Sequence, residues 1–310
     1  MQFLQYEFPD CYDSTVAALA AALAAHGDAR PAYEIAASSS LAFRHFYPSA
    51  SRMAPNALSW DYYNWNAAIP VAISRVGYHC KAADTPAEIL VLTERALASA
   101  APVSVYSPPR MRGFCNIIGK REHHYFADGR THEGRACGWF TAVEYIQSAD
   151  TDAFGFVLSD KIANFLEPAL GEFLANACAA LRGDFEYFEA ARGNDVFTIW
   201  ENDLRAGVAD PAAFRQFLLS FAEARGFAAS ALTDRAERIF DSGTEESLAI
   251  ALASAANEFD AVSQLLFGIA RELLTNETDF AREDRRSSAA GMLQTAARRH
   301  AIAVAALGTG

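Results

Sequence analysis

The sequence predicts an α+β fold made of a mixed module followed by a helical module. Two observations lead to this prediction. Before residue 160, helix and strand signals alternate along the chain, whereas after it apolar residues recur at spacings of three and four, as on helices that bury one face. We expect the first module to span residues 1–162 and the second to span residues 163–310.

Two helices are expected in the first module. The alanine-rich run Ser14–His26 is followed by Gly27, a residue that commonly ends a helix. The run Thr85–Ala100 begins with a threonine that can cap a helix, followed by a proline in the first turn and by Glu88 at the third position after the cap.

Three strands are expected after the second of these helices. Short β-branched or alternating runs cover Ala101–Ser107, Gly138–Gln147 and Ala153–Asp160. Because a short polar segment separates the last two runs, we expect them to form a hairpin.

The second module reads as helical almost throughout. In the run Ala256–Gly268, an apolar stripe must pack on the first module, on its own helices or on a second copy of the chain. We expect it to cover one wall of the first module's cleft and to mediate a homodimer. The helical runs are 161–183, 210–226, 245–276 and 282–307.

Composition excludes several classes of protein. A formal net charge of −12 argues against a nucleic-acid-binding protein. The sequence shows neither a long uncharged apolar run nor a signal peptide, so we expect a cytoplasmic protein that does not bind membranes. The five cysteines are widely spaced and form no C-x-x-C pair, which favours reduced thiols over disulfides or a zinc site.

Cys11 is the cysteine whose surroundings suggest chemistry. It lies just before the predicted helix Ser14–His26, and the positive end of a helix dipole stabilises a thiolate. Gln5 precedes it by six residues, close enough to place a side-chain amide beside the sulfur. Such an amide can donate a hydrogen bond to the oxyanion that forms during acyl transfer.

The stretch around Cys11 resembles the nucleophile motif of papain-like peptidases that trim bacteriocin leaders, also called double-glycine peptidases. The matching residues are Gln5, Asp10, Cys11, Thr15, Ala18 and Leu19. Farther along, the segments Ser38–Pro48 and Ile73–Ser107 resemble the N-terminal domain of the butirosin-biosynthesis acyltransferase family. The resemblance covers roughly residues 1–162 and implies a papain-like cysteine protease fold there, followed by the α-helical C-terminal module.

The same resemblance implies a catalytic triad that this sequence matches only in part. The segment "FVLSD" ending at Asp160 resembles the strand that carries the triad's acid. Tyr12 stands where a glycine usually follows the nucleophile, and Cys137 and Gly138 stand where the histidine is expected.

The base must then come from another part of the chain. The candidate bases are His124 and His132, with His123 a weaker candidate because neighbouring residues of a strand face opposite sides.

From these residues we expect an acyltransferase that forms an amide or ester in specialised-metabolite biosynthesis. An imidazole would deprotonate Cys11, Asp160 would orient the imidazole, and Gln5 with a backbone N–H would hold the oxyanion. The resemblance implies an acyl or peptidyl carrier protein as donor, and a small-molecule amine would accept the acyl group. We expect no metal or redox cofactor; phosphopantetheine would enter only as part of the carrier protein.

Two alternatives remain open at this stage. With water as the acceptor, the same residues would make a cysteine peptidase or amidase. Because the expected strand histidine is missing, the chain could instead be a non-catalytic scaffold on a degenerate papain-like fold.

Two further groups of residues have more than one interpretation. The segment 108–124 is the most basic part of the first module and could dock an acidic carrier protein, although a solvated loop has the same composition. Its basic residues are Arg110, Arg112, Lys120 and Arg121. The remaining cysteines are expected to be packing residues: Cys80, Cys115, Cys137 and Cys178.

Overall fold

The structure is a computed structural model, and it describes residues 4, 11–48, 64–111, 113–131, 134–148, 153–183, 190–193, 195–243 and 245–308. Its contacts divide the chain into two compact units. One comprises Met1–Ser39 and Trp65–Glu167, and the other comprises Ser40–Asn64 and Pro168–Gly310. The elements are helices and strands, so the fold is mixed α+β. The second unit includes Ser40–Asn64, a segment from the N-terminal half that was expected in the first module.

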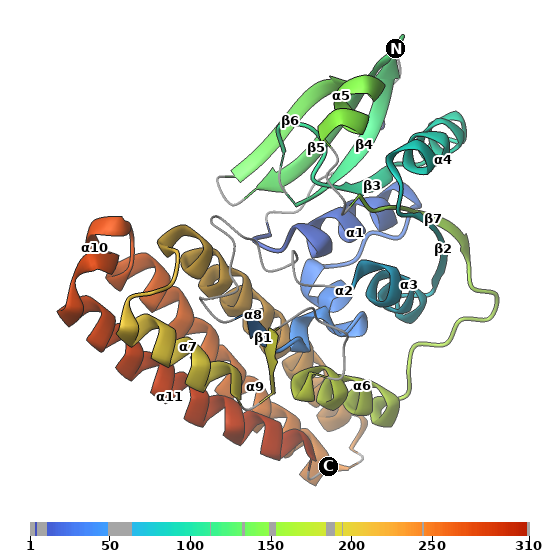
Figure 1. The fold of residues 1–310 in the computed structure, drawn as a ribbon. Coiled ribbons are helices and arrows are strands. Elements are labelled where there is room, and N and C mark those ends of the chain that lie inside the picture. Colours follow the sequence, from blue (N-terminus) through green and yellow to red (C-terminus); the bar gives the residue numbers. More distant parts are fainter. Residues whose placement is uncertain are drawn as a thin grey trace. The chain divides into compact units, whose positions relative to one another are not determined.

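The first unit is built on a six-stranded antiparallel sheet in the order β2-β7-β3-β4-β5-β6 (Figure 1). Its strands are β2 (Tyr78–Ala83), β3 (Val103–Tyr106), β4 (Phe114–Arg121), β5 (His124–Thr131), β6 (Gly134–Thr141) and β7 (Gly155–Lys161). Its helices are α1 (Ser14–Ala25), α2 (Ala32–Ser38), α3 (Trp65–Arg75), α4 (Pro86–Ala98) and α5 (Ala142–Ser148).

The two expected helices of this unit are present, with the expected ends. Gly27, just after α1, has φ +76°, a conformation that glycine adopts without strain. Thr85 caps α4 by accepting a hydrogen bond from the Glu88 N–H at 3.3 Å, and Pro86 is the first helical residue.

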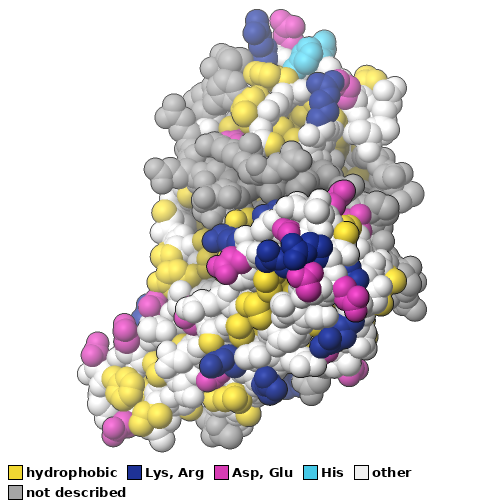
Figure 2. Space-filling model, turned by 90° about the vertical axis from the view of Figure 1, so that its left-hand side faces the viewer, with side chains coloured by type: hydrophobic (Ala, Val, Ile, Leu, Met, Phe, Trp, Pro, Cys, Tyr) yellow, Lys and Arg dark blue, Asp and Glu magenta, His cyan; other side chains and the backbone are white. Residues whose placement is uncertain are grey.

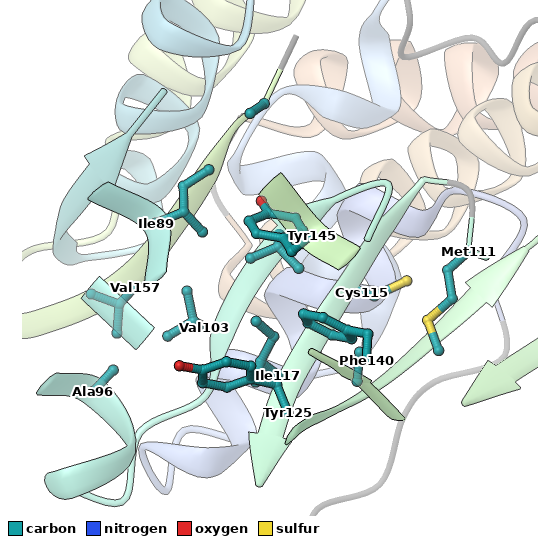
Figure 3. Packing of buried hydrophobic residues seen from close by; sticks show 13 residues of the cluster. Ile89, Ala96, Val103, Met111, Cys115, Ile117, Tyr125, Phe140, Tyr145 and Val157 are labelled. Carbon is teal, nitrogen blue, oxygen red and sulfur yellow. The ribbon is translucent and has the colours of Figure 1, made fainter. Parts of the chain in front are cut away.

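Helices α1 and α4 cover opposite faces of this sheet. Neighbouring residues of a strand point to opposite faces. On β3, Val103 and Val105 join a buried cluster with Ile89 of α4, whereas Ser104 between them belongs to the α1 face. Figure 3 shows this cluster on the α4 side.

The predicted hairpin of residues 138–147 and 153–160 is wrong. β6 ends at Thr141 because a capping box starts α5: Glu144 N–H donates to Thr141 Oγ1 at 3.1 Å, and Thr141 N–H donates to Glu144 Oε2 at 2.7 Å. β7 then pairs with β2 and β3 at the other side of the sheet. The true hairpins, β4–β5 and β5–β6, were not expected.

The second unit is mainly helical. Its elements are η1 (Leu41–Phe43), β1 (Phe46–Pro48), α6 (Leu170–Arg182), β8 (Ala190–Arg192), α7 (Asp195–Ala206), α8 (Pro211–Ser242), α9 (Glu246–Gly268), η4 (Ile269–Leu273), α10 (Glu277–Ala281) and α11 (Glu283–Gly308). Among them, α8, α9 and α11 are long helices that pack side by side (Figure 1). β1 and β8 form a small antiparallel sheet.

The apolar stripe of Ala256–Gly268 packs inside this unit. Phe259, Val262 and Leu266 are buried, and α9 contacts α8 and α11. Helix α8 continues through Gly226, where the sequence suggested an end. A Cβ at Gly226 would lie 3.3 Å from Ser263 Oγ, so the glycine permits the close approach of the two helices.

A buried arginine joins α8 to the N-terminal segment of the second unit. Arg225 donates hydrogen bonds to Ala42 O at 2.9 Å, to Arg44 O at 2.8 Å and to His45 Nδ1 at 3.0 Å. The His45 ring stacks on His300 of α11, with 4.3 Å between ring centroids. These contacts explain why the segment that begins at Ser40 belongs to the helical unit.

In the part of the chain that the structure describes, no helix is both long and apolar enough to cross a membrane.

Candidate functional site

Cys11 lies two residues before the N-cap of α1 and is buried, with 1% of its surface exposed. The N-cap is Asp13, which is also buried and accepts hydrogen bonds from the N–H groups of Thr15 at 2.8 Å and Val16 at 3.4 Å. The expectation that Cys11 precedes a helix N-terminus is thus confirmed by the geometry of α1.

A single hydrogen bond fixes this end of α1 to one end of the sheet. The backbone N–H of Phe114, the first residue of β4, donates to Ser14 Oγ at 2.9 Å. Farther along both elements, Asn116 Nδ2 donates to Ala18 O at 3.1 Å. Helix α1 therefore runs in the same direction as β4, and the N-terminus of α1 adjoins the start of that strand.

A row of polar side chains crosses the sheet beneath α1. Ser104 Oγ donates to Asn116 Oδ1 at 2.6 Å, and Asn116 pairs in register with Asp128 of β5. Residues paired in this way point to the same face, so Asp128 faces α1 as Asn116 does. Asp128 is 5% exposed. Asp128 was not among the predicted site residues, because strand β5 was not predicted.

The structure does not bring His124 to Cys11. His124 is exposed and pairs with Arg121, the last residue of β4, whereas α1 begins at the first residue of that strand. Eight residues of strand place these two ends about 24 Å apart.

Asp160 also lies away from Cys11 and from His124. It is exposed on β7, which is separated from β5 by β3 and β4, so about 14 Å lies between the two strands. Lys161 Nζ, from the next residue, is 3.8 Å from Asp28 Oδ2, just beyond the C-terminal end of α1. The expected Cys11–His124–Asp160 grouping is therefore not present in this structure.

Gln5 and His132 lie outside the described residues. The residues on either side of His132 and Glu133 are described: Thr131 and Gly134 pair with each other where β5 meets β6. Because Gly129 of β5 pairs with Cys115 of β4, the end of β5 at Thr131 is at the same end of the sheet as Phe114 and the N-terminus of α1. Of the candidate bases, His132 is the one that follows this end of β5 in the sequence, whereas His124 begins β5 at the other end.

The other cysteines differ in their surroundings. Cys115 is fully buried in the cluster of Figure 3, and burial raises the pKa of its thiol. Burial also raises the pKa of the Cys80 and Cys178 thiols, which are half-buried. Cys137 is exposed, so the expectation that it is a packing residue is wrong.

The basic residues expected to dock a carrier protein do not form one patch. Arg110 precedes β4 and forms an ion pair with Glu144 at 2.6 Å, whereas Lys120, near the end of β4, pairs with Glu94 at 2.6 Å. Arg121 is exposed beside Lys120, and Arg112 lies outside the described residues. On the face shown in Figure 2, acidic and basic side chains are interspersed.

Among the described residues, no group of three or more His, Cys, Asp or Glu side chains is arranged to hold a metal ion.

No family model matches the chain, and no curated protein matches it.

Proposed function

We propose that the first unit is a cysteine-dependent acyltransferase on a papain-like fold, with Cys11 as the nucleophile. The observation that carries the proposal is the position of Cys11 before the N-terminus of α1, a helix packed against an antiparallel sheet and anchored at its first turn by Ser14. A helix N-terminus stabilises negative charge on a nearby sulfur.

The proposed base and orienting acid are chosen from the described end of β5 that adjoins α1. His132 is the proposed base, since it follows Thr131 in the chain and Thr131 ends β5 on the side of the sheet next to the N-terminus of α1. Asp128 replaces Asp160 as the proposed orienting carboxylate, because it is buried on the α1 face of β5, three residues before Thr131. Gln5 and a backbone N–H keep the proposed role of oxyanion donors.

The proposed reaction has two steps. The imidazole removes the Cys11 proton, the sulfur attacks the donor thioester carbonyl, and the carrier's phosphopantetheine thiolate leaves and takes the proton from the imidazolium. An amine then attacks the acyl-enzyme, the new C–N bond replaces the C–S bond, and the amine's proton passes through the imidazole to the Cys11 sulfur.

A non-catalytic scaffold is the second candidate, and one observation favours it. With 1% of its surface exposed, Cys11 cannot meet a thioester carbonyl unless the residues that cover it move.

The experiment is intact-mass spectrometry after incubation with hexanoyl-N-acetylcysteamine and with a hexanoyl-loaded acyl carrier protein. We expect a hexanoyl adduct that Cys11→Ala abolishes and Cys137→Ala retains. Faster loss of the adduct in the presence of a primary amine supports a transferase, whereas equal loss in buffer alone supports a peptidase or amidase. Absence of any adduct with both donors supports the scaffold.

A further inference from the structure

A cavity of about 730 Å³ opens in the first unit near the C-terminal end of α1. Its walls come from the segment that follows α1, from β2 and β7, and from α4. Pockets that hold small molecules fall in this range of volumes. Because α1 has 12 residues, this end of the helix is about 18 Å from its N-terminus, so the cavity is separate from Cys11.

A group of hydrogen-bonded side chains forms one wall of the cavity. Arg30 donates to both carboxylate oxygens of Asp28, at 2.8 and 2.6 Å, and also to Val76 O at 2.9 Å. Tyr78, whose side chain is buried, donates to Asp28 Oδ2 at 3.1 Å. The bond from Arg30 holds the pKa of Asp28 below its usual range, so the carboxylate is charged and already paired.

The lining also includes two cations that have no such partners among the described residues. Lys81 of β2 and Arg95 of α4 are exposed, and no hydrogen bond or ion pair joins either side chain to another described residue. Both also line an adjoining hollow of about 630 Å³, so they lie between two concave surfaces. Lys161 stands on the β7 side, 3.8 Å from Asp28 and 62% exposed.

The lining therefore has an excess of positive charge in a chain of net charge −12. Three lysine and arginine side chains line the cavity, Lys81, Arg95 and Lys161. Of the two carboxylates in the lining, Asp28 is paired with Arg30, which leaves Asp160. The rest of the lining includes apolar side chains from α4, β7 and the segment before β3: Leu92, Ala96, Ala101, Val157 and Leu158.

We propose that this cavity binds a small organic anion, a phosphate or carboxylate carried on a short hydrocarbon. The anionic group would contact Lys81 and Arg95, and the hydrocarbon would lie on Leu92 and its apolar neighbours. This site is independent of the proposed acyl transfer, since neither Cys11 nor His132 takes part in it.

Calorimetric titration of the full chain with hexyl phosphate, hexanoate, inorganic phosphate and hexanol tests the proposal. Hexyl phosphate or hexanoate should bind at least tenfold more tightly than inorganic phosphate, which lacks the hydrocarbon, and than hexanol, which lacks the charge. The tighter of the two amphipathic anions identifies the head group. If neither binds more tightly than inorganic phosphate and hexanol, the proposal is overturned.

Variants locate the binding. Lys81→Ala and Arg95→Ala should each weaken binding of the tighter anion roughly fivefold, as expected for a solvent-exposed ionic contact. Ser99→Trp, at an exposed position of the lining, should fill the cavity and abolish binding. Arg110→Ala is the control. It removes an equal charge from a residue that precedes β4 and does not line the cavity, so the affinity should be unchanged. Equal affinities for all these variants would place the anion elsewhere and overturn the proposal.

Discussion

The backbone N–H of Phe114 and the hydroxyl of Ser14, 2.9 Å apart, join the first residue of β4 to the first residue of α1. Both groups are buried, so the bond is shielded from water. This contact determines which end of the sheet lies beside Cys11, and His124 lies at the other end.

Ser14→Ala should destabilise the first unit by about 1–2 kcal/mol, because it leaves a buried N–H without its acceptor. Urea denaturation measures this loss. Ser74→Ala is the control: its hydroxyl also makes a backbone hydrogen bond, to Val71 O at 2.8 Å, but at an exposed site, and should change stability by less than about 0.5 kcal/mol. Equal effects would mean that the Ser14 contact contributes little.

Limiting iodoacetamide should modify Cys137 first and Cys115 last, since the first thiol is exposed and the second is buried with a raised pKa. Acyl thioesters should instead modify Cys11, because a catalytic site selects by binding rather than by exposure alone. Peptide mapping after each reagent gives both orders. If acyl thioesters modified Cys137 first, as iodoacetamide is expected to do, Cys11 would not be the nucleophile.

His132→Ala should slow acylation of Cys11 by roughly 10²- to 10⁴-fold, the usual contribution of a general base. His124→Ala should change the rate less than about twofold, since His124 is the first residue of β5 and pairs with Arg121 at the end of β4 farthest from α1's N-terminus. The rates are followed by intact mass at several pH values. If His124→Ala slowed acylation more than His132→Ala did, Cys11 would have to lie at the other end of the sheet, and the assignment of His132 would be wrong.

Stability of the second unit should fall as the pH drops below the ordinary histidine pKa of about 6.5. Burial lowers the pKa values of His45 and His300, with further lowering from the positive charge of Arg225. The unfolded chain then binds protons that the folded chain does not, and the unfolding free energy decreases with falling pH. His300→Phe should reduce this slope by about one proton. His79→Ala, at an exposed position of the first unit, should leave it unchanged.

Local signals predicted the helix ends well. Thr85 and Gly27 act through contacts with residues a few positions away, so a short stretch of sequence contains the information. Thr141 and Glu144 carried an equally local signal for the start of α5, but the alternation of residues 138–147 suggested a strand that continued past it.

Long-range pairing was the part that the sequence left undetermined. Nothing near Asp160 indicates that β7 inserts between β2 and β3, and nothing near Asp128 marks it as buried beneath α1. The acid was assigned to Asp160 by the resemblance of the segment that ends there, whereas register across the sheet pairs Asp128 with Asn116, on the face that α1 covers. Arg44 and Arg225 likewise meet although 181 positions separate them in the chain.

Arg44 donates a hydrogen bond to Ser220 Oγ at 2.6 Å, although 176 positions separate the two residues in the chain. This contact has a consequence for synthesis on the ribosome. At typical elongation rates of about 5–20 residues per second, the segment around Phe46 emerges roughly ten seconds or more before α8 can cover it. Phe43, Phe46 and Tyr47, all fully buried in the finished protein, stay exposed during that interval. The nascent chain thus offers an apolar segment to chaperones until its own C-terminal half arrives.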